Sequence, residues 1–293
     1  MPNRRLVFAA LAALALSACG QKQTGTYAVA AATAAVDPSG FDAIKAEADA
    51  LWVDRGDRAK LEAAIAKYEA AQTAKPADRE VAVRLARAYY FLGDTHLDGD
   101  ERLAAWDKSI TAGKRCIAIN NEFVTLLEKG DETEQTAVRV LKADDAPCLY
   151  WTSTALGKWA KMQGLGTTLK HIGTVEAYMR RVTELTPTYF FHAPDRYWGA
   201  YFALIPSFKG QDLGKSKTHL DASLAGSPQY LPTKVIYADA WAVASQDKAA
   251  YQRMLEEVIA ADPGQDPDCK AENVAAIDQA KKLLAQADDR FVN

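Results

Sequence analysis

The feature that most constrains the fold is a group of small and aromatic residues that recur at helical spacing. In the segment 41–78, Ala64, Tyr68 and Ala71 follow one another at intervals of four and three residues, and Pro76 comes shortly after them. These intervals place side chains on one face of a helix, and proline ends a helix because it has no backbone N–H to donate. The segment therefore predicts two helices that pack closely through small residues.

Similar segments follow at repeat-like distances. Leu85, Ala86 and Tyr89 stand where the next tetratricopeptide-type repeat, about 34 residues long, expects a leucine, a small residue and a tyrosine. Further segments of helical period end at Pro187, Pro228 and Pro263. Strand-like alternation is absent. We predict an all-α fold of about four to five degenerate helix pairs and a closing helix from Ala271 to Asp288, in a closed or strongly curved α-solenoid.

The first twenty residues have the composition of a bacterial export signal. Arg4 and Arg5 precede an apolar run at residues 6–16, which is too short to span a membrane. Leu16 to Cys19 resembles a lipobox, in which the cysteine thiol receives a diacylglycerol and becomes the first residue of the mature protein. An ordinary secretory signal with a chance cysteine is the alternative.

This signal divides the chain into three parts. We predict a lipoprotein signal peptide at residues 1–18, a tether at 19–39 and a single helical repeat domain at 40–293. Lipid on Cys19 would anchor the protein to a membrane, facing the periplasm, without a spanning segment. Because no aspartate follows this cysteine, the outer membrane is the expected destination.

The charge balance excludes one class of partner. The formal net charge is −3 at pH 7, and removal of the two arginines of the signal makes it more negative. A nucleic-acid-binding face needs an excess of basic residues to displace counterions from phosphates. We therefore expect no nucleic-acid partner.

Three cysteines remain after Cys19, namely Cys116, Cys148 and Cys269. In an oxidising compartment this odd number allows one disulfide and one free thiol. Cys116 with Cys148 is the preferred pair, because that bond would close the acidic segment between them, but the sequence leaves the other pairings open. No CxxC, HExxH or Cys/His cluster is present, so we predict no metal site and no cofactor.

Several shorter motifs do not meet the requirements of their chemistry. The acidic loop that begins at Asp94 resembles a calcium loop, but Ala105 stands where a bidentate carboxylate is needed. Residues 210–216 and 164–169 resemble glycine-rich phosphate loops, but their glycine spacing is wrong and no strand precedes them. The four histidines have no nucleophile elbow near them. We therefore predict no catalytic residue.

The densest aromatic segment runs from Pro187 to Pro206. Seven aromatic residues fall within fourteen positions of this segment, although only 9% of the whole chain is aromatic. As a helix beginning after Pro194, the segment places Trp198, Tyr201 and Phe202 on one face. Such a face is a well-packed core or the wall of a ligand cavity, and both interpretations stay open.

Arg196 is the polar side chain to follow in this segment. A guanidinium among aromatic rings stacks on a ring or binds the carboxylate of a ligand. A surface ion pair with Asp195 or Asp212 is the alternative that we favour. Together with the apolar segment 147–162, the aromatic segment supplies the candidate residues of a ligand cleft: Tyr150, Trp151, Tyr189, Phe191, His192, Arg196, Tyr197, Trp198, Tyr201 and Phe202.

Three blocks of sequence resemble a known family. They are LYWTSTALGKWA at residues 149–160, HAPDRYWGAYFALIP at 192–206 and KSKTHLDASLAGSPQYLPTKVIYADAWAV at 215–243. With the lipobox before them, the chain from about Phe41 to its C-terminus is similar to the T-component lipoproteins of tripartite ATP-independent periplasmic (TRAP) transporters, often called TatT. The cysteines after Cys19 are not part of this resemblance.

The resemblance implies a helical protein of cryptic tetratricopeptide repeats that encloses an apolar cleft, suited to an apolar small-molecule ligand. It also implies self-association as a homotrimer and docking to the periplasmic solute-binding subunit of a TRAP transporter. The family supplies no catalytic residues. Our first hypothesis is therefore a lipid-anchored accessory subunit of a TRAP-type uptake system. The alternative is a non-transport repeat scaffold for the assembly of an envelope complex, and an enzyme is the third and least supported option.

Overall fold

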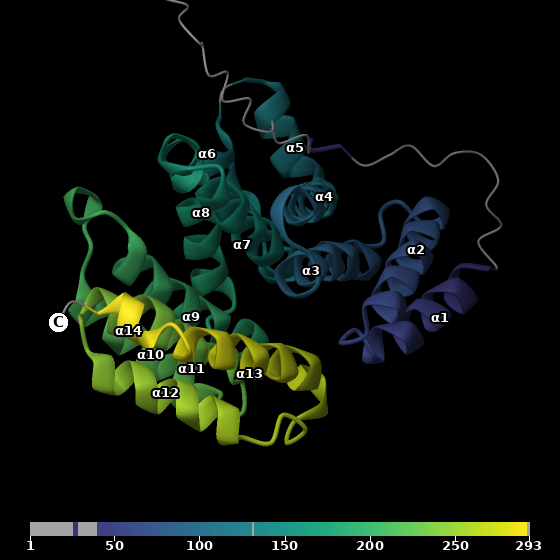
Figure 1. The fold of residues 1–293 in the computed structure, drawn as a ribbon. Helices are drawn as coiled ribbons and strands as arrows, with labels where there is room; N and C mark the ends of the chain where they lie inside the picture. Colours follow the sequence, from purple (N-terminus) through teal and green to yellow (C-terminus); the bar gives the residue numbers. More distant parts are fainter. Residues whose placement is uncertain (1–25, 29–39, 131, 292–293) are drawn as a thin grey trace, which may run out of the picture.

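A computed structural model describes residues 26–28, 40–130 and 132–291 (Figure 1). The predicted signal peptide and Cys19 lie outside the described residues. None of the described helices has the length and the apolar run needed to cross a bilayer.

The predicted all-α class is confirmed, since the described residues form fourteen α-helices and no strand. The first part of the domain contains α1 (Phe41–Val53), α2 (Arg58–Ala74), α3 (Arg79–Thr95), α4 (Gly99–Ile117), α5 (Asn121–Glu128) and α6 (Glu134–Ala137). The second part contains α7 (Ala146–Met162), α8 (Leu165–Leu185), α9 (Tyr189–Leu204), α10 (Leu213–Gly226), α11 (Pro232–Ile236), α12 (Lys248–Ala260), α13 (Lys270–Leu284) and α14 (Ala287–Arg290). Short 3-10 turns stand between some of them, and a π-helical turn, η5 (Tyr237–Ala242), continues α11.

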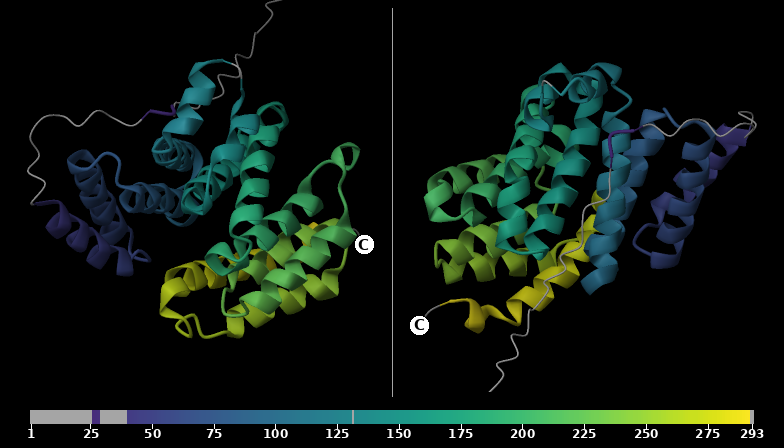
Figure 2. Two further views of the ribbon diagram at one scale, coloured as in Figure 1. Left: turned by 180° about the vertical axis from the view of Figure 1, so that it is seen from behind. Right: turned by 90° about the horizontal axis from the view of Figure 1, so that it is seen from above.

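Consecutive helices pack in pairs. The pairs are α1 with α2, α3 with α4, α7 with α8, α9 with α10, and the continuous α11–η5 segment with α12. The last long helix, α13, packs against α12 and α11 (Figures 1 and 2). Helices α5 and α6 interrupt this order and lie at one end of the domain, while α4 contacts α7 directly. The expected helix pairs and final helix are thus present.

Side-chain caps explain where several helices begin. An aspartate or asparagine before the first turn accepts a hydrogen bond from a backbone N–H three residues later, at 2.8 to 3.2 Å. This bond satisfies one of the donors that the first turn of a helix leaves free. The capping residues are Asp57, Asp78, Asn120, Asp212 and Asp247.

Small residues bring the helices close together. Ala64 and Ala71 of α2 are fully buried beside Tyr68, whose hydroxyl donates to Asp49 of α1 at 2.6 Å. Gly113 of α4 stands where any side chain would collide with α7. Only glycine permits this approach of the two helix backbones.

A buried carboxylate joins the two ends of the domain. Glu272 of α13 accepts hydrogen bonds from Arg55, which follows α1, at 2.6 Å and from Arg87 of α3 at 2.8 Å. The side chain of Glu272 is 8% exposed and that of Arg55 is 5% exposed. Arg55 also donates to the carbonyl of Asp268 at 2.7 Å, and the ring of Trp52 lies 4.8 Å from its guanidinium. The N-terminal helices and the C-terminal helix therefore share one desolvated charge network.

The arginines keep the Glu272 carboxyl charged. Burial alone would raise its pKa, but the charges of Arg87 and Arg55 and their hydrogen bonds outweigh burial and hold the pKa below its usual range. Because the folded-state pKa is lowered, the carboxylate stabilises the fold above the ordinary glutamate value of about 4.3. This contribution is lost as the pH falls through the lower, folded-state pKa.

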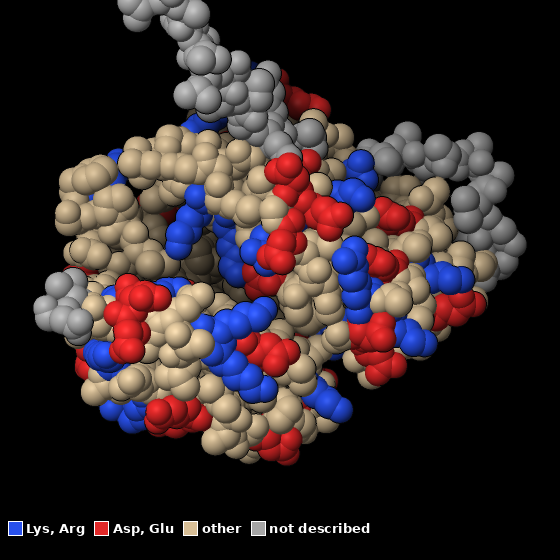
Figure 3. Space-filling view, in the orientation of Figure 1, with Lys and Arg blue, Asp and Glu red and all other residues tan. Residues whose placement is uncertain are grey.

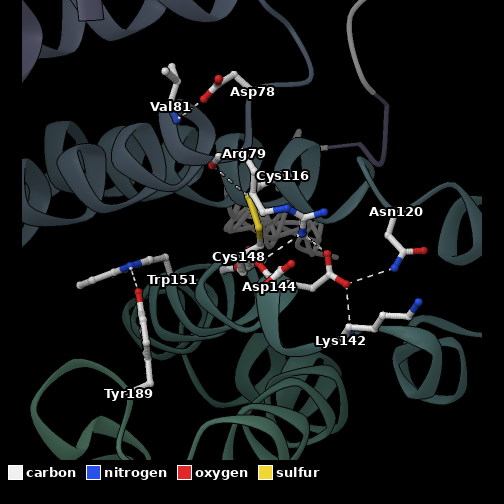
Figure 4. Close-up of a disulfide and its surroundings, with 12 residues drawn as sticks. Asp78, Arg79, Val81, Cys116, Asn120, Lys142, Asp144, Cys148, Trp151 and Tyr189 are labelled. Carbon is white, nitrogen blue, oxygen red and sulfur yellow. Dashed lines mark hydrogen bonds and ion pairs between the residues drawn. A yellow bond between two sulfur atoms is a disulfide. The ribbon is translucent and has the colours of Figure 1, made fainter. Parts of the chain in front are cut away.

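A disulfide joins Cys116, at the end of α4, to Cys148, at the start of α7, with Cα atoms 5.5 Å apart (Figure 4). The loop between them carries α5 and α6, and a bond that closes a loop of this length stabilises a fold by about 3–4 kcal/mol. Next to it, the buried Asp145 accepts hydrogen bonds from Arg79 and from Asn120. The remaining thiol, Cys269, is buried, and burial raises its pKa to about 11.

We expect Glu272→Gln to lower the free energy of unfolding by about 3–5 kcal/mol at pH 7, because two buried guanidinium groups would lose the anion that they share. The variant should also lose less stability than the wild type between pH 5 and pH 3. Urea denaturation across this pH range measures both effects. Glu184→Gln, which removes an exposed ion pair with Arg181, is the matched control and should cost at most about 0.5–1 kcal/mol. Equal losses in the two variants would contradict a structural role for the buried network.

Candidate functional site

The aromatic segment begins with a strained turn. At the start of α9, Phe190, Phe191 and His192 have φ angles of 45°, 56° and 53°. Residues other than glycine lose about 1–2 kcal/mol each in this left-handed conformation. Right-handed helix follows from Ala193, with Pro194 in its first turn, where a missing N–H is tolerated. The prediction of a helix beginning after Pro194 placed the start too late and missed the turn, because no glycine marks it.

Arg196 stabilises this turn from inside the protein. Its Nη1 donates to the carbonyl of Phe191 at 2.8 Å, and its Nη2 donates to the carbonyl of Phe190 at 3.3 Å. The guanidinium carbon lies 4.3 Å from the ring centroid of Tyr230, a cation–π distance. Arg196 is only 4% exposed. It is therefore a positioning residue for the backbone of the turn.

The expected ion pair of Arg196 with Asp195 or Asp212 was wrong. Asp195 Oδ1 lies 2.8 Å from His219 Nδ1 on α10, and Asp212 caps α10 and pairs with Lys215 at 3.2 Å. The left-handed turn directs carbonyls away from the usual helical donors. Arg196 faces these carbonyls, whereas Asp195 faces the neighbouring helix.

Helix α10 holds the other side of the turn. The ring of His192 packs so closely on Gly226 that any side chain there would collide with it. Ser223 Oγ donates to the carbonyl of His192 at 3.2 Å. A side chain at position 226 would therefore displace the ring of His192.

An inner aromatic cluster surrounds the turn. Neighbouring ring centroids in it are 4.8 to 6.2 Å apart, which is the range of favourable aromatic packing. Trp151 Nε1 donates to the hydroxyl of Tyr189 at 3.1 Å (Figure 4). Burial raises the pKa of Tyr189 to about 12, although Arg87 nearby opposes the shift, so the phenol stays neutral at physiological pH. The members are Tyr150, Trp151, Tyr189, Phe190, Phe191 and Tyr230.

A separate pocket of about 300 Å³ opens between α8, α9 and α10. Figure 3 shows a hollow in this part of the molecule, bordered by basic side chains, between the helices around α8 and those around α9 and α10. The pocket is lined by Glu176, Arg180 and Thr183 of α8, Trp198, Tyr201 and Phe202 of α9, Lys209 and Gly210 of the following loop, and His219 of α10.

Two polar contacts fix the aromatic wall of this pocket. Trp198 Nε1 donates to Thr183 Oγ1 at 2.9 Å, and the hydroxyl of Tyr201 donates to the carboxylate of Glu176. Burial and the hydrogen bond to Glu176 raise the pKa of Tyr201, so that it keeps its proton as the donor. The wall therefore has a defined shape before any ligand binds.

The pocket lining includes two cations, Arg180 and Lys209, and one carboxylate, Glu176, which accepts the hydrogen bond from Tyr201. The guanidinium carbon of Arg180 lies 5.7 Å from the ring centroid of Trp198. Within the described part of the chain, neither Arg180 nor Lys209 forms an ion pair. His219 completes this side, stacked on Phe202 with ring centroids 5.9 Å apart. Such a pocket can hold a ligand with an apolar body against the rings and a negative group near the cations.

The ten predicted cleft residues fall in two places. Tyr150, Trp151, Tyr189 and Phe191 belong to the inner aromatic cluster, with Arg196 against it and His192 beside it. Trp198, Tyr201 and Phe202 line the pocket, and Tyr197 stacks on Tyr201 behind them. The pocket residues Glu176, Arg180, Lys209 and His219 were not predicted as site residues from the sequence. The one sequence signal was the spacing of Glu176, Arg180 and Thr183. These residues are four and three positions apart, which places their side chains on one face of a helix.

No set of three or more His, Cys, Asp or Glu side chains within the described ranges is placed to hold a metal ion. Consecutive helix pairs, with a pocket between α8, α9 and α10, define a helical-repeat protein. The family model for the TRAP transporter T-component matches residues 58–291, a range that includes every pocket residue. The chain therefore belongs to the TRAP transporter T-component family. A comparison with curated proteins found no match. Membership of this family implies association with a TRAP transporter and points to a location in the cell envelope.

We expect Arg196→Met to lower the free energy of unfolding by about 2–4 kcal/mol, because the variant keeps the volume of the side chain but leaves two carbonyls of the strained turn without a charged donor. The free energy of unfolding of Arg196→Lys should lie between those of Arg196→Met and the wild type, since lysine cannot reproduce the planar fork of the guanidinium group. Chemical denaturation measures the difference. Arg180→Met is the control and should change stability by less than about 1 kcal/mol. A fully stable Arg196→Met protein would show that the turn does not need this side chain.

Proposed function

We propose that this chain is a lipid-anchored accessory subunit of a TRAP-type uptake system, which docks a periplasmic solute-binding subunit and binds a small molecule. Membership of the T-component family carries the proposal. The lipobox that ends at Cys19 supports attachment to a membrane of the bacterial envelope, with the outer membrane as the expected one and the helical domain in the periplasm. Assembly as a homotrimer is part of the same proposal.

Exposed apolar side chains next to the pocket support docking there. Phe208 is 72% exposed and Leu204 is 50% exposed. Lys209, which lines the pocket, directly follows Phe208. Exposed apolar side chains beside a pocket are typical of surfaces that bind a partner. A solute-binding subunit seated on Phe208 would cover the mouth of the pocket, so that a ligand could pass between the two proteins.

The composition of the pocket supports an amphipathic anion as ligand. Trp198, Tyr201 and Phe202 offer rings to an apolar body, while Arg180 and Lys209 offer charge to a carboxylate or a similar group. The proposed ligand class is therefore more specific than the apolar molecule expected from the sequence. Its proposed site is the space between α8, α9 and α10 and not the region of Arg196. The competing hypothesis is a non-transport repeat scaffold for the assembly of an envelope complex, which would bind no ligand and no solute-binding subunit.

We expect Phe208→Ser to weaken binding of a TRAP solute-binding subunit from the same organism by roughly tenfold, because an apolar anchor is lost from the interface. Isothermal titration calorimetry with the two purified proteins measures the affinity. Val53→Ser removes a side chain that is 71% exposed on α1 and serves as the control. Unchanged affinity in Phe208→Ser would move the docking surface elsewhere, and no binding by the wild type would favour the scaffold hypothesis.

We expect native mass spectrometry of the wild-type protein to detect a retained anionic ligand, and Arg180→Gln to reduce its occupancy by about tenfold, because a charge-assisted hydrogen bond is lost. Lys170→Gln, on an exposed part of the same helix, should retain the ligand. Equal occupancy in the Arg180→Gln and wild-type proteins would place the ligand outside this pocket.

A further inference from the structure

A short described piece of the N-terminal segment lies on the helical domain. Tyr27 packs edge-on against Phe123 of α5, with ring centroids 5.3 Å apart, and its hydroxyl hydrogen-bonds to that of Tyr178 of α8. The amino group of Lys114 of α4 lies 4.9 Å from the centroid of the Tyr27 ring. In Figure 1 this piece, residues 26–28, is the short purple ribbon beside α5.

The receptor of Tyr27 is built from four helices. Phe123 and Tyr178 are fully buried, and Lys114 is 8% exposed. Glu134 of α6 lies 3.5 Å from the amino group of Lys114. The hydroxyl of Tyr178 forms its hydrogen bond with Tyr27, and removal of Tyr27 would leave a buried donor unsatisfied, which is unfavourable. The contact is therefore complementary in shape and in hydrogen bonding.

This contact shortens the connection between Cys19 and the domain. Residue 27 is eight positions from Cys19, whereas the first residue of α1, Phe41, is twenty-two positions away. An extended chain spans at most about 3.6 Å per residue. The connection from Cys19 to the domain is therefore at most about 29 Å long when Tyr27 is docked and at most about 79 Å long when it is not. A domain of this size has a radius of gyration of about 18 Å. The connection from docked Tyr27 is thus shorter than two radii of gyration of the domain, whereas the connection from α1 is longer than four.

We propose that Tyr27 docks the N-terminal segment on the end of the domain formed by α4, α5, α6 and α8, so that this end faces the membrane. The orientation rests on the proposed lipid anchor, whereas the docking does not. Helices α12 and α13 lie at the opposite end of the domain from α5 in Figures 1 and 2 and face away from the membrane. The membrane-facing end is the same in every molecule, because the receptor is part of the fold.

Charge does not provide this orientation. Residues 121–142, which include α5 and α6, contain five acidic and three basic side chains. Adsorption to an anionic membrane needs a basic cluster near the surface. The tether contact, and not attraction to lipid head groups, holds this end near the membrane.

The docking is tested by hydrogen exchange on the full-length lipoprotein in liposomes. Tyr27→Ala should make exchange roughly tenfold faster in peptides that contain Phe123 and Tyr178, because a ring contact and a hydrogen bond are lost. Tyr27→Phe keeps the ring and should show a smaller change. Peptides of α12 should not change in either variant, which controls for general destabilisation. Unchanged exchange around Phe123 and Tyr178 in Tyr27→Ala would overturn the docking.

The orientation is tested by energy transfer to an acceptor dye on lipid head groups. Glu128→Cys on α5 and Glu256→Cys on α12 place a donor dye at exposed positions of the two ends, and transfer should be stronger from position 128. Adding Tyr27→Ala should remove most of the difference. Equal transfer from both positions, or a difference that survives Tyr27→Ala, would overturn the orientation. Flotation of the protein with the liposomes is measured first. If the protein does not float, the lipid anchor and the orientation both fail, and the exchange experiment still decides the docking.

Discussion

The relative position of the helix pairs depends on one shared anion. Glu272 bonds to Arg55 across 217 residues of sequence and to Arg87 across 185. The next residue, Asn273, accepts a hydrogen bond from the backbone N–H of Leu231 at 3.0 Å and donates one to the carbonyl of Gln229 at 3.0 Å. The charge network therefore fixes not only α13 but also the segment that carries Tyr230. A contact between the two ends of the domain thus determines the position of the Tyr230 ring, which lies against the guanidinium group of Arg196.

The turn before α9 shows how local strain and long-range packing balance. Three left-handed residues together disfavour the turn by about 3–6 kcal/mol. Hydrogen bonds from a charged donor contribute about 1.5–3 kcal/mol each, and aromatic pairs contribute about 0.5–1.5 kcal/mol each. The donor is Arg196, and the rings come from α7 and from the segment before α11. The turn is stable only when these distant elements are assembled, which couples the start of α9, and through it the pocket wall, to the whole domain.

The parts of the fold that depend on local periodicity could be predicted from the sequence. The spacing of Ala64, Tyr68 and Ala71 determines a helix face, and the faces repeat, so the helix pairs and the final helix were predictable. The surroundings of Arg196 were not, because a left-handed turn without glycine has no local signature and is held by residues distant in sequence. The pocket was predictable only on its α9 side. Arg180 and Lys209 come from a helix and a loop whose approach to α9 is a property of tertiary packing.

The disulfide has a consequence for the order in which the molecule matures. Phe123 and Glu134, which form half of the receptor of Tyr27, both lie in the loop that Cys116 and Cys148 close. Thiols remain reduced in the bacterial cytoplasm and are oxidised after export. In an exported chain, the disulfide would therefore form, and constrain this loop, only after the loop had crossed the inner membrane. The receptor would then be completed after translocation, at the stage at which the predicted signal peptide would be removed.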